Sequence, residues 1–189
     1  MILISKDRYF EIEQEVFYTL EDTHTSSFPV MAQDIARALH ITLVPYSDLS
    51  PEDYEKAMNE SEDGYSFYDY EPGTDILVYY IHYNDDKPRH RKKWTICHEI
   101  GHIRLGHHDG NLSYEEAEQE ANYFAKYLLA PYPMVQICGC EDPWDVSDTF
   151  DVSLEAASYI WDSYLKWSSY RPIENIPQEE RLIQLFCAA

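Results

Sequence analysis

The sequence has few basic residues for its length. Of 189 residues, 14 are Lys or Arg and 35 are Asp or Glu, so the formal net charge at pH 7 is −21. A chain with this balance repels phosphate backbones and anionic lipid surfaces. We therefore expect neither nucleic acid nor a membrane as its direct partner. Residues 87–93 hold five of the 14 basic side chains; we expect a solvated loop there, and the alternative is a basic rim that docks an acidic segment of a substrate or of this chain.

Long apolar runs and a cysteine framework are missing as well. No run approaches the ~20 apolar residues that a membrane-spanning helix requires. The apolar residues 1–4 stop before Lys6, too early for a secretory signal. The four cysteines do not form a disulfide framework, and Cys138-Gly139-Cys140 has no second Cys or His pair with which to hold a metal. These absences predict a cytoplasmic protein whose thiols are reduced.

The most informative pattern is the pentapeptide His98-Glu99-Ile100-Gly101-His102. On a helix, His98 and His102 lie one turn apart and point the same way, so their imidazoles can hold one zinc ion. Glu99 lies beside that face, close enough to take a proton from a metal-bound water. This is the arrangement of a zinc metallopeptidase.

The alternative for this segment is a surface helix with two solvated histidines. Ile96, Ile100 and Ile103 recur at the i, i+4, i+7 spacing of an apolar helical stripe. Gly106 and Gly110 then supply a helix stop. The motif is therefore predicted on a packed helix.

A catalytic zinc requires a third protein ligand and an open coordination position. The acidic helix predicted over residues 113–130 offers four candidates, Glu115, Glu116, Glu118 and Glu120. Its start is marked by a capping box of Ser113 and Glu116. Glu118 precedes Asn122 by one turn on the same face, so its carboxylate can bind the metal while the amide orients a ligand imidazole. We expect three of the four glutamates on a solvated face.

Together these segments carry a family resemblance. The string H-E-I-G-H, a short interval, and then E-x-x-A-N-x-F-A-x-x-L-L-x-P from Glu118 onward resemble the ImmA/IrrE family of metallo-endopeptidases. The similarity extends upstream to a short helix at residues 32–40 before an apolar strand, a second strand that ends in Asn84, and residues 94–97. It covers about residues 30–133. Ala130 departs from it, at a position where Met is common, and no chemical consequence is expected.

The resemblance implies His98, His102 and Glu118 as zinc ligands, Glu99 as the general base and Asn122 as the partner of a ligand imidazole. It implies a zinc-dependent endopeptidase that hydrolyses a specific protein, a helix-turn-helix repressor of a phage, mobile element or stress regulon. Two alternatives stand beside it. A metal-containing binding protein would sequester a regulatory partner without cleaving it, and it would not need Glu99. A transcription factor would read DNA through the C-terminal helices.

We predict an α+β fold, with a small, mostly antiparallel sheet packed on a zincin-type pair of active-site helices. Residues 1–133 are expected to form the zinc metallopeptidase domain, and residues 134–189 a helix-turn-helix-like extension packed on it. Besides the pair, the predicted helices cover residues 8–20, 29–40, 51–59, 145–150, 153–167 and 178–187. The predicted strands cover residues 41–46, 65–71 and 75–83, the last two joined by a hairpin turn.

Residues 144–167 have the pattern of a helix-turn-helix: a helix, a tight turn and a second helix. The second helix carries Glu155, Asp162 and a single Lys166, whereas a DNA reader carries Arg, Lys, Asn or Gln there. We therefore expect these helices to buttress the active site or to dock a protein partner.

Two parts of the chemistry follow from the site. We expect an exposed strand at residues 76–83 to align the substrate by backbone pairing, because this strand precedes the histidine helix. The oxyanion needs a stabiliser besides zinc. His107, His108, Tyr114 and several other tyrosines are candidates, and the sequence does not choose among them.

Overall fold

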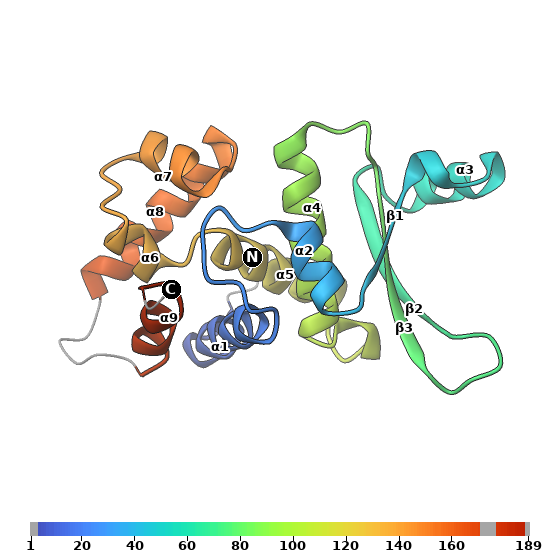
Figure 1. Ribbon diagram of the computed structural model, residues 1–189, viewed down its shortest axis with the longest axis horizontal. Coiled ribbons are helices and arrows are strands. Elements are labelled where there is room, and N and C mark those ends of the chain that lie inside the picture. Colours follow the sequence, from blue (N-terminus) through green and yellow to red (C-terminus); the bar gives the residue numbers. More distant parts are fainter. Residues whose placement is uncertain (1–3, 171–176, 188–189) are drawn as a thin grey trace.

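The computed structural model describes residues 4–170 and 177–187 as helices arranged beside one small sheet (Figure 1). The helices are α1 (Lys6–Asp22), α2 (Ala32–Ala38), α3 (Pro51–Glu60), α4 (Arg89–Arg104), α5 (Tyr114–Leu129), α6 (Tyr132–Ile137), α7 (Pro143–Phe150), α8 (Leu154–Tyr170) and α9 (Pro177–Cys187). The strands are β1 (Thr42–Pro45), β2 (Gly64–Tyr70) and β3 (Leu77–Tyr83), and two short 3-10 turns are η1 (Tyr46–Asp48) and η2 (His107–Asp109). The predicted α+β class is confirmed, and the described elements lie close to their predicted bounds; helix α6 was not expected.

The sheet is mixed, with the strand order β1–β3–β2. β2 and β3 form the predicted antiparallel hairpin, with Gly64 opposite Tyr83. β1 lies parallel to β3 on its other edge, with Thr42 opposite Tyr80. The prediction of a mostly antiparallel sheet is therefore wrong. The reason lies in the connection: the chain passes through α3 between β1 and β2, and the hairpin then brings β3 back beside β1 in the same direction.

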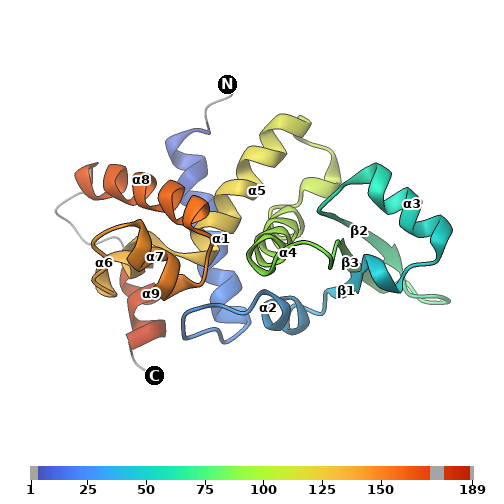
Figure 2. The same ribbon diagram turned by 90° about the horizontal axis from the view of Figure 1, so that it is seen from above.

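Helix α4 lies at the centre of the fold, between the sheet and α5 (Figure 2). Ile96 and Ile100 are fully buried on it, as their spacing predicts. α4 and α5 cross closely at Gly101, where an added Cβ atom would lie only 3.0 Å from Phe124 Cδ1. The glycine of the pentapeptide therefore allows the close approach of the two helices. α4 ends at Arg104, and Gly106 follows with φ of 71°, which confirms the predicted stop.

Helix α5 begins at the predicted capping box. Ser113 Oγ accepts a hydrogen bond from the Glu116 backbone N–H at 3.3 Å, and Glu116 Oε2 accepts one from the Ser113 N–H at 3.0 Å. The buried side of the helix includes Ala121, Phe124 and Leu128. This arrangement turns the predicted apolar side of α5 into the core.

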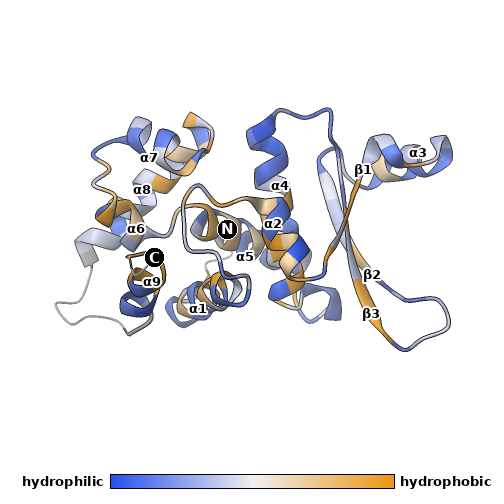
Figure 3. Cartoon of the chain, viewed as in Figure 1, coloured by the Kyte–Doolittle hydropathy of each residue, from blue (hydrophilic) through white to orange (hydrophobic). Residues whose placement is uncertain are grey.

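The basic segment at residues 87–93 is not a solvated loop. Most of it forms the hydrophilic first turns of α4 (Figure 3), and acidic residues of this chain neutralise it. Arg91 pairs with Asp63 before β2, and Arg89 and Lys93 pair with Asp151 between α7 and α8. Positive charge at a helix N-terminus is unfavourable, and these carboxylates offset that cost. The alternative prediction, in which the segment docks an acidic part of this chain, agrees with the structure.

The C-terminal helices lie at the end of the molecule opposite the sheet (Figures 1 and 2). Val146, Phe150 and Ile160 are fully buried and belong to the same buried cluster as Val16 and Leu128. The residues after Pro131 thus share their core with the helices that precede them. The division of the chain at residue 133 stays a prediction.

The four cysteines are free thiols. Cys138 and Cys140 belong to no group of three potential metal ligands within the described part of the chain. Across residues 4–170 and 177–187, no helix has both the length and the apolar character needed to cross a membrane.

Candidate metal centre and active site

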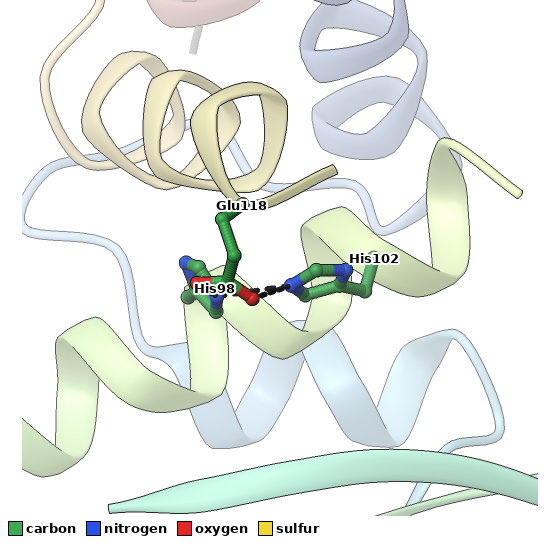
Figure 4. A group of neighbouring side chains, drawn as sticks. All are labelled: His98, His102 and Glu118. Carbon is green, nitrogen blue, oxygen red and sulfur yellow. Dashed lines mark hydrogen bonds and ion pairs between the residues drawn. The ribbon is translucent and has the colours of Figure 1, made fainter. Parts of the chain in front are cut away.

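Two neighbouring helices bring His98, His102 and Glu118 together (Figure 4). His98 and His102 project from one face of α4, and Glu118 reaches them from α5. The Nε2 atoms of the two histidines lie 3.0 Å apart. Glu118 Oε1 lies 3.2 Å from His102 Nε2, and Oε2 lies 3.5 Å from His98 Nε2. The side chains are 13 %, 15 % and 32 % exposed in sequence order, so the cluster is largely shielded yet reachable from solvent.

The donor set and its spacing fit a zinc ion. Ligands bound about 2.1 Å from a tetrahedral zinc lie about 3.4 Å from one another, and the three distances above are close to that separation. Two imidazole nitrogens and one carboxylate oxygen leave one position open, as a catalytic site requires. In the metal-free site the neighbouring imidazoles of His102 and His98 hold the pKa of Glu118 well below its usual range, so its carboxylate is charged.

The other three glutamates of α5 have different environments. Glu115 is exposed, Glu116 closes the capping box, and Glu120 pairs with Arg8 of α1. The expectation that one of the four turns toward the histidines is therefore met by Glu118. Glu120, however, is buried rather than solvated.

Glu99 lines the same pocket as His98, His102 and Glu118. It is 7 % exposed, and its Oε2 accepts a hydrogen bond of 2.7 Å from Ser66 Oγ. Burial raises the pKa of Glu99 above its ordinary value, and the neighbouring His98 and His102 act in the opposite direction. A buried carboxylate held by one hydrogen bond beside a potential metal site is suited to moving a proton.

Ser66 was not expected at the site. It belongs to β2, where its neighbours Tyr65 and Phe67 are aromatic, and it stands opposite Ile81 in the hairpin register. Cross-strand partners share a face of the sheet, and Ile81 is fully buried. A polar residue on the buried face of the strand could have pointed to Ser66. That face, however, is known only once the register of the hairpin is known.

A cavity of about 670 Å³ lies between α4, α5 and β2, and its lining includes His98, Glu99, His102 and Glu118. Tyr114, at the start of α5, stands at its rim with 79 % of its surface exposed. The negative charge of Glu118 is the main cause that raises the pKa of Tyr114, and burial and the charge of Glu99 contribute. His107 and His108 also line the cavity, but their imidazoles are engaged with Glu120 and with the Ser66 carbonyl.

Asn122 does not make the expected contact with an imidazole. It lies exposed on the cavity wall and forms no side-chain hydrogen bond within the described residues. His107 takes that place instead, because its Nδ1 lies 3.0 Å from Nδ1 of His102. His107 is on η2, and its ring comes back over the end of α4 after Gly106.

The strand expected to align a substrate is not available for that role. β3 is the central strand, paired on both sides over residues 80–83, and β2 is the edge strand beside the cavity. The Asn84 N–H donates to Asp63 O and the Glu71 N–H donates to Ile76 O, so the odd-numbered residues of β2 face β3. The backbone groups of Gly64, Ser66 and Tyr68 therefore point to the outer edge. His108 Nε2 donates to one of them, Ser66 O, at 3.2 Å.

Comparison with known proteins adds a family to this geometry. The sequence model of the family described as the IrrE N-terminal-like domain matches residues 43–161, more than half of the chain. A comparison with curated proteins finds no match. The matched region runs from β1 into α8 and includes His98, Glu99, His102 and Glu118. On this match the chain belongs to the IrrE N-terminal-like family of peptidases, M78.

Proposed function

We propose that this protein is a zinc-dependent endopeptidase that hydrolyses one specific protein. The observation that carries the proposal is the convergence of two groups on one cavity. His98, His102 and Glu118 place their donor atoms within 4.8 Å of one another, and the buried carboxylate of Glu99 lines the same space. Membership in a peptidase family supports the same reaction class.

His98, His102 and Glu118 would hold the zinc, and Glu99 would handle the proton. When bound, zinc supplies a Lewis acid that acidifies a water and polarises the scissile carbonyl. Glu99 would accept the proton of the attacking water as the C–O bond forms, and it would return that proton to the leaving amine as the C–N bond breaks. Burial raises the pKa of Glu99, and a carboxyl group with a raised pKa accepts and returns a proton more readily than an ordinary glutamate. Ser66 holds Oε2 in place, which leaves Oε1 for the proton.

Tyr114 is the proposed second stabiliser of the oxyanion. It lines the same cavity as Glu118, and its hydroxyl forms no hydrogen bond within the described residues. A phenol O–H aimed at the developing charge would add to the stabilisation that zinc supplies. His107 and His108 are less suited, because their imidazoles already bind other groups.

The substrate would enter as an extended segment along the outer edge of β2. The backbone groups of Gly64, Ser66 and Tyr68 face that edge, and Ser66 also contacts Glu99. Backbone pairing to an exposed strand would therefore place a peptide bond beside the general base. Because His108 already donates to Ser66 O, a substrate strand would pair there only after displacing His108.

Sequestration without cleavage is the alternative function. A binding protein would gain nothing from Glu99, whereas burying a carboxylate costs several kcal/mol unless it is compensated. Within the described residues Glu99 accepts one hydrogen bond, from Ser66, and the neighbouring His98 and His102 also favour its charged form, so its burial is compensated only in part. A costly group beside a potential metal site favours catalysis.

The proposed substrate is a helix-turn-helix repressor of a phage, mobile element or stress regulon, on the resemblance to the ImmA/IrrE family. The test compares host cells that produce the wild type with cells that produce Glu99→Gln, and identifies new protein N-termini by mass spectrometry. We expect new N-termini from one DNA-binding regulator with the wild type only. Identical sets of N-termini would remove the peptidase function, and a regulator recovered bound to both forms would then support sequestration.

Three further predictions stay proposals of the same kind. The protein is proposed to be cytoplasmic. Residues 134–189 are proposed as a helical extension of a catalytic part that ends at residue 133. The C-terminal helices are proposed not to read DNA, because residues 134–189 contain ten acidic and three basic side chains.

A further inference from the structure

Two nearly buried polar side chains next to the metal centre have no role in the chemistry described above. His107 is 3 % exposed and Glu120 is 7 % exposed at the side chain. His107 Nε2 lies 3.1 Å from Glu120 Oε2, and His107 Nδ1 lies 3.0 Å from Nδ1 of His102. Arg8 of α1 donates from Nε to Glu120 Oε1 at 2.8 Å and from Nη2 to Oε2. A continuous line of contacts therefore runs from a proposed zinc ligand to the N-terminal helix.

The hydrogens along this line have only one consistent arrangement if His102 binds a metal. A neutral imidazole carries one N–H, so binding through Nε2 places the hydrogen of His102 on Nδ1. His102 Nδ1 then donates to His107 Nδ1, which leaves the hydrogen of His107 on Nε2. That N–H donates to the Glu120 carboxylate, which can only accept. Every contact thus has one donor and one acceptor, and Arg8 supplies two more donors to the same carboxylate.

The opposite arrangement would defeat metal binding. If His107 Nδ1 donated to His102, the hydrogen of His102 would lie on Nε2, the atom that points at His98 and Glu118. Nε2 would then have no lone pair for zinc. A carboxylate at the far end selects against this arrangement, because it requires an N–H on the near nitrogen of His107.

We propose that His107, Glu120 and Arg8 are positioning residues that hold His102 in the tautomer and orientation that zinc needs. The proposal rests on the proposed function, in which His102 is a ligand. It also gives α1 a role at the metal centre, although α1 lies outside the region that matches the family. A histidine ligand commonly donates its second N–H to such a partner, and loss of that partner typically weakens metal binding by 10–100-fold.

The test measures the zinc dissociation constant by competition with a chromogenic chelator, using zinc alone as the probe. Glu120→Gln and His107→Phe are expected to bind zinc about 10–100-fold more weakly than the wild type. Glu115→Gln is the matched control for Glu120, since it removes the same charge from an exposed position on the same helix. Glu11→Gln is the control for the variant Arg8→Gln, because it removes the exposed second partner of Arg8 and leaves the contact with Glu120.

A rescue separates positioning from simple packing. The amide of His107→Gln can accept a hydrogen bond at one end and donate at the other, so this variant should recover much of the affinity that His107→Phe loses. The double variant His107→Phe with Glu120→Gln should bind zinc no more weakly than the poorer single variant, because both act through one line of contacts. Thermal unfolding of the metal-free proteins shows separately what each change costs the fold.

The outcomes are distinct. A wild type that does not bind one zinc overturns the proposed function itself. A wild type that binds zinc, with Glu120→Gln and His107→Phe within twofold of it, overturns the positioning role. Equal losses of zinc affinity in His107→Gln and His107→Phe, accompanied by lost stability of the metal-free protein, would show that these contacts only stabilise the fold. That result would also overturn the positioning role. If Glu120→Gln fails to fold, Arg8→Gln replaces it in the same zinc-affinity assay, because 31 % of the Arg8 side chain is exposed. Affinity within twofold of the wild type would then overturn the positioning role.

Discussion

Lys93 links the active-site helix α4 to the C-terminal end of α7. Its side chain is 9 % exposed, and its Nζ donates to Phe150 O at 3.0 Å and to Asp151 O at 3.1 Å. Those carbonyls belong to the C-terminal end of α7, where a positive charge is favourable. Asp151 Oδ2 lies 3.6 Å from the same nitrogen. Lys93→Met keeps most of the side-chain volume and removes all three interactions.

The expected loss of stability follows from these contacts. Hydrogen bonds to a charged group contribute about 1.5–3 kcal/mol each, and the buried Phe150 carbonyl and the partly buried Asp151 carbonyl would lose their donor. Burial of the ammonium works against it, and this burial lowers the pKa of Lys93. We therefore expect Lys93→Met to cost about 2–3 kcal/mol, a smaller amount than the two bonds taken together. For a chain of this length that corresponds to a fall in Tm of about 4–12 °C.

The assay is urea unfolding monitored by circular dichroism, with Arg89→Met as the control. Arg89 pairs with the same Asp151, but 73 % of its side chain is exposed, so its removal should cost less than about 1 kcal/mol. Equal and small losses in the two variants would refute the reasoning. They would mean that the buried hydrogen bonds of Lys93 contribute no more than a surface ion pair.

Three further predictions concern the site and its surroundings. Glu99→Gln should retain zinc and fold but cleave the substrate about 10²–10⁴-fold more slowly, in single-turnover assays on the regulator that the N-terminus comparison identifies; unchanged cleavage would remove its role as base. Glu118→Gln should lose most of its zinc after dialysis, and Glu115→Gln should keep about one ion per chain, both by elemental analysis; the reverse pattern would show that the wrong glutamate is assigned. Burial raises the pKa of Glu13 to about 7, above its value in an unfolded chain. The folded state therefore favours the neutral carboxyl, and the free energy of unfolding falls as pH rises from about 4.5 through 7. Glu13→Gln should therefore stabilise the fold by about 1–3 kcal/mol at pH 8.5 and by little at pH 4.5 in urea titrations, whereas an equal effect at both pH values would contradict this linkage.

Local patterns in the sequence were sufficient for the helices that carry the site. The isoleucine spacing and the glycine stop predicted α4, and the capping box predicted the start of α5. Both signals are short-range, because a helix is defined by contacts within one or two turns. His98 and His102 share a face for the same reason. Placing Glu118 opposite them needed the family resemblance, since its three neighbours carry the same side chain.

Features that depend on contacts distant in sequence were not predicted. The position of β1 beside β3 depends on a crossover, and the free edge of β2 follows only once that order is known. Arg8 meets Glu120 across 112 positions of sequence, so no local pattern pointed to it. Helix α6 was missed for a different reason: the catalytic domain was predicted to end at Pro133, but this proline lies in the first turn of α6, where proline is tolerated.

The most direct test of the central claim is the zinc K-edge X-ray absorption spectrum of the purified protein, recorded with its metal content. We predict about one zinc per chain, with nitrogen and oxygen ligands at about 2.0–2.1 Å from the zinc. These ligands would be the imidazoles of His98 and His102, the carboxylate of Glu118 and a water. A spectrum dominated by sulfur ligands at about 2.3 Å would place the metal on cysteines instead, and a protein that binds no zinc would contradict the account altogether.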